Sequence, residues 1–122
     1  RVKAKYSLGH GAEHWRDEFD FDVSPYSDNI FAAAVEKGGM LWVNREFWRA
    51  RKDVQIRDSK RVLGAVDCLI YVLQVNGKKP GMFYADRADF GGRITQEHAD
   101  SFHHFATQAQ YNLEVLTMRR QT

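Results

Sequence analysis

The sequence predicts one α+β domain, an antiparallel β-sheet with helices on both faces and a long C-terminal helix. Its 122 residues, 43% of them apolar, are enough for one hydrophobic core and too few for two. The Asn76-Gly77 pair separates two apolar runs, which is typical of a β-hairpin. Apolar residues then recur at alternating spacings of three and four from Ala99 to Leu116, as on one face of a helix. No interdomain linker interrupts the chain, so we expect residues 1–122 to form a single domain.

The first quarter of the chain predicts two short strands around a helical segment. Val2 to Leu8 alternates apolar and basic residues, as in a half-exposed strand, and Gly9-His10-Gly11 then favours a turn. Residues 12–19 fit a short helix. Residues 19–23 alternate aromatic or aliphatic side chains with acidic ones and predict a second strand.

The next segment predicts a helix followed by a buried strand. Ser27 is suited to cap the helix, whose apolar residues share one face until Gly38-Gly39 terminates it. Met40 to Val43 then predicts a short buried strand. Asn44 to Arg61 lacks a clear period, so we expect loops and short helical turns there.

The second half of the chain predicts a hairpin and a long helix. The arms of the hairpin are Cys68 to Val75 and Gly81 to Asp86. Residues 69–73 are apolar at consecutive positions, so this strand should be central in the sheet and covered on both faces. Thr95 is suited to cap the last helix, which we expect to run to about Arg120.

The last helix carries two apolar stripes. We expect the first stripe to pack on the sheet and to meet Ile70 and Val72 in one core. The first stripe consists of Ala99, Phe102, Ala106, Ala109, Leu113 and Leu116. The second stripe, formed by Tyr111, Val115 and Met118, lies nearly opposite and predicts the interface of a homodimer. The alternative is that another segment of the same polypeptide covers it.

Composition and motifs limit the classes of function. A formal net charge of +2 predicts no general attraction to nucleic acid or anionic membranes. Cys68 is the one cysteine, so we expect no internal disulfide and no cysteine-only zinc site, which suits a reducing cytoplasm. No apolar run is long enough to insert into a membrane, and no nucleophile elbow, P-loop or dinucleotide motif is present. His10 and His14 have a metal-pair spacing, but the glycines around His10 oppose a helix there. We expect no catalysis, metal or cofactor.

The segment from Trp42 to Lys52 is the best candidate for a binding site. It concentrates two tryptophans, a phenylalanine and four basic residues, a mixture suited to stacking a planar ligand and pairing with an anionic one. The predicted ligand site is one concave surface bordered by Trp42, Asn44, Trp48, Arg51 and Tyr71. The alternative is that Trp42 and Phe47 belong to the core while the arginines line a solvated loop.

Several segments, taken in their order, carry the pattern of a known family. Val2 to Gly9 is a strand closed by a glycine turn, and the helix of residues 27–38 precedes the strand Met40-Leu41-Trp42-Val43-Asn44. In the hairpin of residues 68–86, an apolar strand and a polar turn lead to a glycine-led strand that ends in an acid. Thr95-Gln96-Glu97, followed by residues 105–109, opens the last helix. Together these segments resemble the GAF domains, the small-molecule sensor modules of signalling proteins.

The resemblance implies a non-catalytic regulatory module with a profilin-like or PAS-like sheet. Its pocket would lie on the sheet face opposite the terminal helices, and a small ligand there would change how the last helix is presented to an attached output domain. In relatives this helix often pairs with its copy in a parallel dimer and continues into the output domain. We therefore expect a cytoplasmic, homodimeric sensor, part of a longer signalling protein. The alternative is a degenerate GAF-like domain that acts only in dimerisation.

Three features depart from the family pattern. The usual first helix and first strand are absent, so the domain is truncated, unusual or completed by another chain. Val72 stands where many members have proline. The Asn-Lys-Phe-Asp-Glu set of cyclic-nucleotide-binding members is not found, which argues against cyclic GMP or cyclic AMP as the ligand.

Overall fold

The structure is a computed structural model that describes residues 2–3, 20–21, 27–54, 67–87 and 93–121. The short helix predicted over residues 12–19 and most of the strand predicted over Val2 to Leu8 lie outside these residues. The two-residue strands β1 and β2 pair antiparallel. In chain order the elements are β1 (Val2–Lys3), β2 (Asp20–Phe21), α2 (Ile30–Lys37), β3 (Gly39–Val43), α3 (Arg45–Ala50), β4 (Cys68–Val72), β5 (Met82–Asp86) and α5 (Gln96–Gln121).

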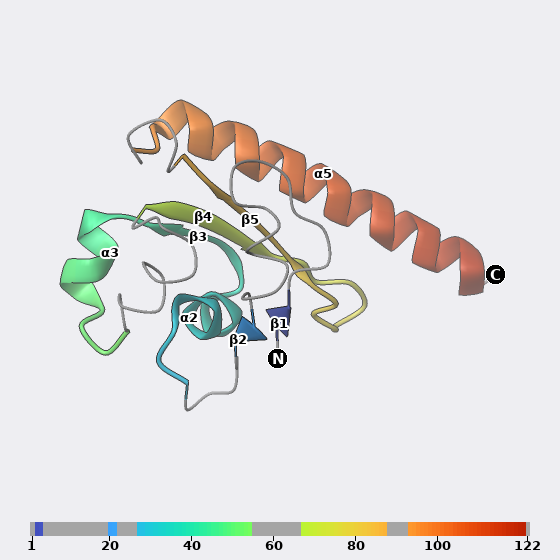
Figure 1. Ribbon diagram of the computed structural model, residues 1–122. Helices are drawn as coiled ribbons and strands as arrows, with labels where there is room; N and C mark the ends of the chain where they lie inside the picture. The colour runs from blue at the N-terminus through green and yellow to red at the C-terminus, as the bar shows by residue number, and fades with distance from the viewer. Residues whose placement is uncertain (1, 4–19, 22–26, 55–66, 88–92, 122) are drawn as a thin grey trace.

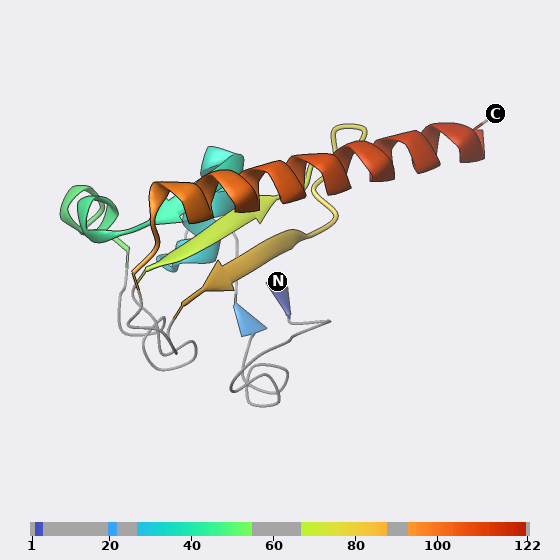
Figure 2. The ribbon, with the colours of Figure 1, turned by 90° about the horizontal axis from the view of Figure 1, so that it is seen from above.

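The larger sheet forms the middle of three layers. β4 lies between β3 and β5 and pairs antiparallel with both. Figures 1 and 2 show α5 over one face of this sheet and α2 against the other. The predicted α+β class, the antiparallel sheet and the long C-terminal helix are therefore confirmed.

β4 is the central strand, as its uninterrupted apolar run predicts. All five of its residues are buried. The register places Tyr71 opposite Met40 on β3 and opposite Phe83 on β5. These three side chains share the face of the sheet that α5 covers.

The alternation of β4 divides the interior into two cores. Ile70 and Val72 pack with α2 on one face of the sheet. On the other face the first stripe of α5 packs against Leu69, Tyr71 and Leu73. The prediction that this stripe meets Ile70 and Val72 is wrong, because successive residues of a strand point to opposite faces.

α2 begins two residues later than Ser27 predicts. Asn29 is the N-cap, and its side-chain oxygen accepts a hydrogen bond from the Ala32 N–H at 2.9 Å. Serine and asparagine cap helices about equally well, so residue type alone does not separate the two positions. Gly38 ends the helix at a φ of 74°, as predicted, and its N–H donates to the Ala34 carbonyl.

The turn between β4 and β5 has the predicted hairpin geometry. Asn76 and Gly77 have φ values of 53° and 75°, both positive, as a two-residue type I′ turn requires. Val75 and Lys78 exchange backbone hydrogen bonds of 2.9 and 3.0 Å across it. The chain therefore reverses tightly at the end of the sheet.

α5 begins at its predicted cap and is longer than the strands that it covers. The His98 N–H donates to Thr95 Oγ1, and Ala99 and Ala106 are fully buried. Twenty-six helical residues extend about 39 Å, whereas a five-residue strand extends about 17 Å. The C-terminal half therefore projects past the sheet (Figures 1 and 2). Leu113 and Leu116 are 39% and 53% exposed, so the expectation that both pack on the sheet is wrong.

Candidate functional site

The five residues predicted to border one ligand site do not converge. Trp42 and Tyr71 lie on the α5 face of the sheet. Trp48 packs against the core on the α2 face. The sheet therefore separates the tryptophans, and the concave surface predicted from their closeness in sequence is not formed by these side chains.

Asn44 and the residues after it build the short helix α3. The Asn44 side chain accepts a hydrogen bond from the Phe47 N–H at 3.0 Å and so caps the helix. Phe47 and Trp48 meet edge to face, with ring centroids 5.2 Å apart. Both rings pack against the α2-side core. The alternative that Phe47 is a packing residue is confirmed, and Asn44 has a capping role.

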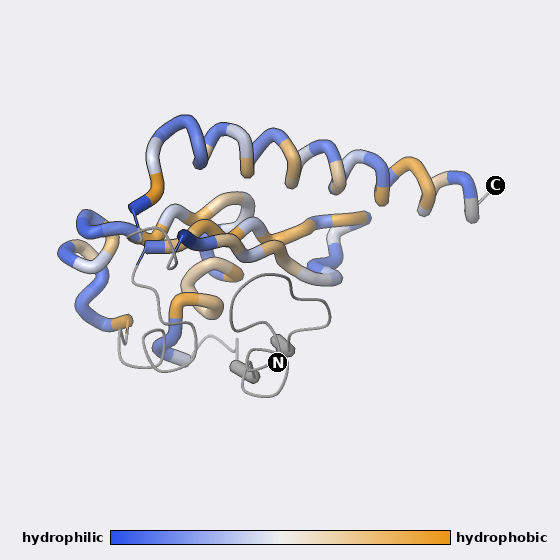
Figure 3. Tube along the Cα trace, turned by 45° about the horizontal axis from the view of Figure 1, so that its top comes forward, coloured by the Kyte–Doolittle hydropathy of each residue, from blue (hydrophilic) through white to orange (hydrophobic). Residues whose placement is uncertain are grey.

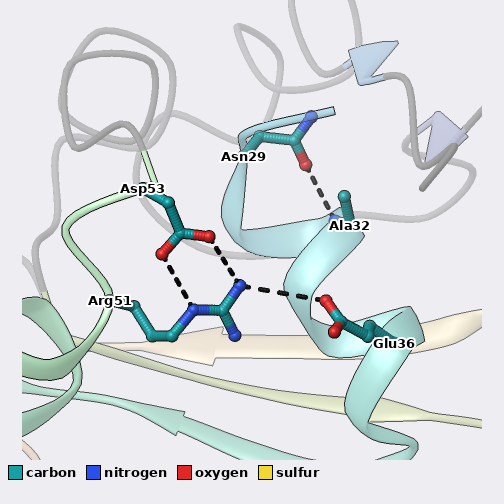
Figure 4. A network of polar contacts seen from close by, with 5 residues as sticks. All are labelled: Asn29, Ala32, Glu36, Arg51 and Asp53. Carbon is teal, nitrogen blue, oxygen red and sulfur yellow. Dashed lines mark hydrogen bonds and ion pairs between the residues drawn. The ribbon is translucent and has the colours of Figure 1, made fainter. Parts of the chain in front are cut away.

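Arg51 is held by carboxylates at the surface (Figure 4). Its Nε and Nη2 donate to the two oxygens of Asp53 at 3.0 Å each, and Nη2 lies 3.8 Å from Glu36 Oε2. The hydrogen bonds from Arg51 lower the pKa of Asp53, and the same bonds raise the pKa of Arg51. Arg51 therefore links the end of α3 to α2, and its Nε and Nη2 donors already face carboxylate oxygens.

Tyr71 and α5 are joined through one glutamine. Gln110 Oε1 accepts from the Gln74 N–H at 2.9 Å and from the Tyr71 hydroxyl at 3.4 Å. The Tyr71 ring also meets the His103 ring edge to face at 6.0 Å. Gln110 was not predicted, because a bond between residues 36 positions apart has no local sequence signal.

Trp42 is partly buried between the sheet and the first turns of α5. It packs with Leu69, Ile94 and Ala99, which places it in the core, as the alternative interpretation predicted. Its indole Nε1 is buried and has no hydrogen-bond partner among the residues that the structure describes. A buried donor without an acceptor costs free energy and is uncommon in folded proteins. This N–H is therefore the buried side-chain donor of the described residues that lacks an acceptor.

Cys68 is buried in the α2-side core, against which the partly buried Tyr84 of β5 also packs. Burial is the main cause that raises the pKa of this thiol. Burial also raises the pKa of Tyr84, whose hydroxyl donates to Asp86 Oδ2 at 2.6 Å. A thiol held in its protonated form is a poor nucleophile, so Cys68 is chemically inert in the folded chain, as its apolar strand predicted.

No three metal-ligating side chains gather within the described residues, and His10 and His14 lie outside them. Among the described helices, none combines the length and hydropathy needed to cross a bilayer.

The exposed large hydrophobic side chains of the described residues all lie on α5, and most of them on its projecting half. Tyr111 and Met118 of the second stripe are 60% and 62% exposed. Figure 3 shows hydrophobic positions recurring along α5 beyond the sheet. Phe105 is also exposed and its ring lies 5.3 Å from that of Phe83 on β5. Comparing helix length with strand length would have located the exposed end of the first stripe from the sequence.

Comparison with known proteins gives no match for this chain, whether to a family model, a curated protein or a solved structure.

Proposed function

We propose that this chain is a non-catalytic regulatory module of GAF-like type, part of a cytoplasmic signal-transduction protein, in which α5 is the output element. The observation that carries the proposal is the projection of α5 past its sheet with large apolar side chains exposed. One end of such a helix is packed on the sheet and the other end is exposed. A conformational change in the domain can therefore move the exposed half and alter its contacts with a partner. Helices on both faces of an antiparallel sheet agree with the resemblance seen in the sequence.

The proposed partner of the projecting half is a second copy of the chain. Tyr111, Val115 and Met118 lie on one side of the helix at spacings of four and three, the separation that places side chains in one helix–helix seam. Tyr111 and Met118 would lose most of their exposed area on pairing. Burial of such aromatic and thioether groups is the main favourable contribution to association.

Sedimentation velocity at micromolar concentration tests the pairing. The wild-type chain is expected to sediment as a dimer, and Tyr111→Glu with Val115→Glu as a monomer. Arg45→Glu with Arg49→Glu, on the exposed side of α3, is the matched control and should remain dimeric. A wild-type monomer, or a dimer that survives the Tyr111 and Val115 changes, would contradict the proposed interface.

The proposed sensory input is a small molecule with a hydrogen-bond acceptor, bound at Trp42. Support comes from the indole N–H of Trp42, which has no acceptor within the described part of the chain and lies beneath the first turns of α5, where a ligand would touch the output helix directly. A ligand that binds only the folded state raises the melting temperature. A metabolite panel is expected to contain a stabilising compound whose effect is lost in Trp42→Phe and kept in Trp48→Phe. A shift lost only in Trp48→Phe would place the ligand on the other face.

A structural module that only dimerises is the second candidate function. It is favoured by the positions of Trp42 and Tyr71, which pack beneath α5, and of Trp48, which packs against the α2-side core. This candidate predicts a stable dimer and no thermal shift with any metabolite. The two candidates therefore share the sedimentation result and differ in the melting experiment.

A further inference from the structure

Asn76 lies at the tip of the hairpin between β4 and β5, directly before Gly77. Both residues are exposed, and the loop that carries them extends beyond the ends of the two strands (Figure 1). The backbone hydrogen bonds across the turn join Val75 and Lys78. Within the described part of the chain, neither the Asn76 side chain nor the Gly77 N–H makes a hydrogen bond. A side-chain amide and a backbone nitrogen are therefore both open to solvent at this position.

This pair of residues has the atoms needed for spontaneous deamidation. Once hydroxide has removed its proton, the Gly77 nitrogen can attack Cγ of Asn76, and ammonia leaves as the bond from Cγ to Nδ2 breaks. Water then opens the five-membered succinimide ring. Breakage of the new N–Cγ bond gives aspartate, and breakage of the main-chain bond gives isoaspartate. Glycine hinders the attack least of all residues, because it has no Cβ.

The closed turn opposes this attack. The φ values of Asn76 and Gly77, 53° and 75°, are those of a type I′ turn. At the ψ of about 30° that this turn type requires, the Gly77 nitrogen lies nearly opposite Asn76 Cβ across the Cα–C bond. The succinimide ring needs the two atoms on the same side, so the turn must open before the ring forms. Exposed hydrogen bonds such as those across this turn contribute little net stability, so the tip opens more readily than the strands.

The other asparagines lack this combination of features. Asn29 and Asn44 cap α2 and α3 through their side-chain oxygens. Asn112 is exposed, but it lies inside α5, where the helix fixes the backbone. Each of the three precedes a residue with a large side chain, which hinders attack by its nitrogen. Asn76 is therefore the asparagine at which we expect deamidation.

We propose that Asn76 is a modification site, at which opening of the turn allows deamidation and the isoaspartate product then prevents the turn from closing. Isoaspartate adds one carbon to the main chain, so the geometry of a two-residue turn no longer fits. Beside the turn, the Gln74 N–H donates to Gln110 Oε1 on α5 at 2.9 Å. Loss of the turn therefore weakens a contact between the hairpin and α5. The proposal stands independently of the dimer and of any ligand.

Prolonged incubation of the folded chain at pH 8, followed by mass spectrometry of its peptides, tests the site. The peptide with Asn76 is expected to gain one dalton, and the peptide with Asn112, the internal control, should not. A sample unfolded in urea is incubated in parallel. Asn76 should react there about tenfold faster, the factor expected when two exposed hydrogen bonds no longer have to break.

Hydrogen exchange of the modified chain tests the consequence. Ion exchange separates the isoaspartate form, because the new carboxylate lowers the net charge by one. In this form the Gln74 amide is expected to exchange severalfold faster than in the unmodified chain. The Ile70 amide in the central strand is the control and should keep its rate.

Four results would overturn the proposal. A reaction at Asn76 in the unfolded chain alone would mean that the native turn does not open, and equal rates in both samples would mean that the turn does not protect. Unchanged exchange of the Gln74 amide in the isoaspartate form would contradict the loss of the turn. The side chain of Asn76→Gln is too long to form the five-membered ring, so a mass gain that persists in this variant would assign the reaction to another amide.

Discussion

Two alanine substitutions, at Ile70 and at Leu113, test how far the sheet covers α5. The quantity compared is the loss in the free energy of unfolding. Ile70 is fully buried in the central strand, between the pairing strands β3 and β5. Removing three carbons there leaves a cavity that rigid neighbours on both strands cannot fill. We expect Ile70→Ala to lower the free energy of unfolding by about 4 kcal/mol.

Leu113 has the same volume and a different environment. It is 39% exposed and lies in the C-terminal half of α5, so its removal opens no closed cavity. Only part of its apolar area leaves water on folding, and alanine is the better helix former. We expect Leu113→Ala to lower the free energy of unfolding by about 1 kcal/mol.

Urea unfolding measures both values. The slope of the free energy against urea should be the same in the two variants and the wild type, which shows that the unfolding reaction is unchanged. Unfolding is measured at two protein concentrations a hundredfold apart, because a contribution from association depends on concentration and one from folding does not. Equal losses for Leu113→Ala and Ile70→Ala at the lower concentration would refute the assignment of Leu113 to the projecting half.

Further variants test the turn, the thiol, the glutamine bridge and the surface ion pair. Gly77→Ala should cost about 1 kcal/mol in urea unfolding, because the φ of 75° disfavours a side chain although the space is open; a neutral result would contradict the turn geometry. Cys68 should react with a disulfide reagent at pH 8 only in proportion to the unfolded fraction, since burial raises the pKa of its thiol; rapid reaction of the native chain would contradict its burial. Gln110→Ala should speed hydrogen exchange of the Gln74 amide severalfold, whereas Gln108→Ala, an exposed glutamine on the same helix, should not. Arg51→Ala should raise the pKa of Asp53 towards its ordinary value, measured by NMR titration; an unchanged pKa would mean that the two-bond contact does not persist in solution.

Local signals predicted most of the framework. The Asn76-Gly77 turn, the glycine end of α2 and the Thr95 cap are each set by one or two residues, so a pattern in the sequence is sufficient. The uninterrupted apolar run of β4 predicted that this strand is central, because apolar side chains on both faces of a strand must both be buried. The resemblance of the whole chain to GAF domains remains a proposal.

The candidate site was less predictable because it depends on which face each side chain takes. Trp42 and Trp48 are six residues apart, yet a strand carries the first to one side of the sheet and a helix carries the second to the other. The bond between Gln110 and Gln74 joins distant segments and has no local signature. The exposed end of the first stripe follows from the relative lengths of α5 and the strands, which periodicity alone does not give.

Pairing of the projecting halves of α5 is tested most directly by a distance between two copies. Because Cys68 is buried and inert, a spin label on Asn112→Cys, an exposed position beside Tyr111, marks α5 once per chain. Pulsed electron resonance is expected to give a single short distance between labels, since parallel helices bring equal residue numbers together. The same label on Glu46→Cys of α3 should give only longer distances. Absence of any dipolar signal from the label on α5 at micromolar concentration would contradict pairing through this helix.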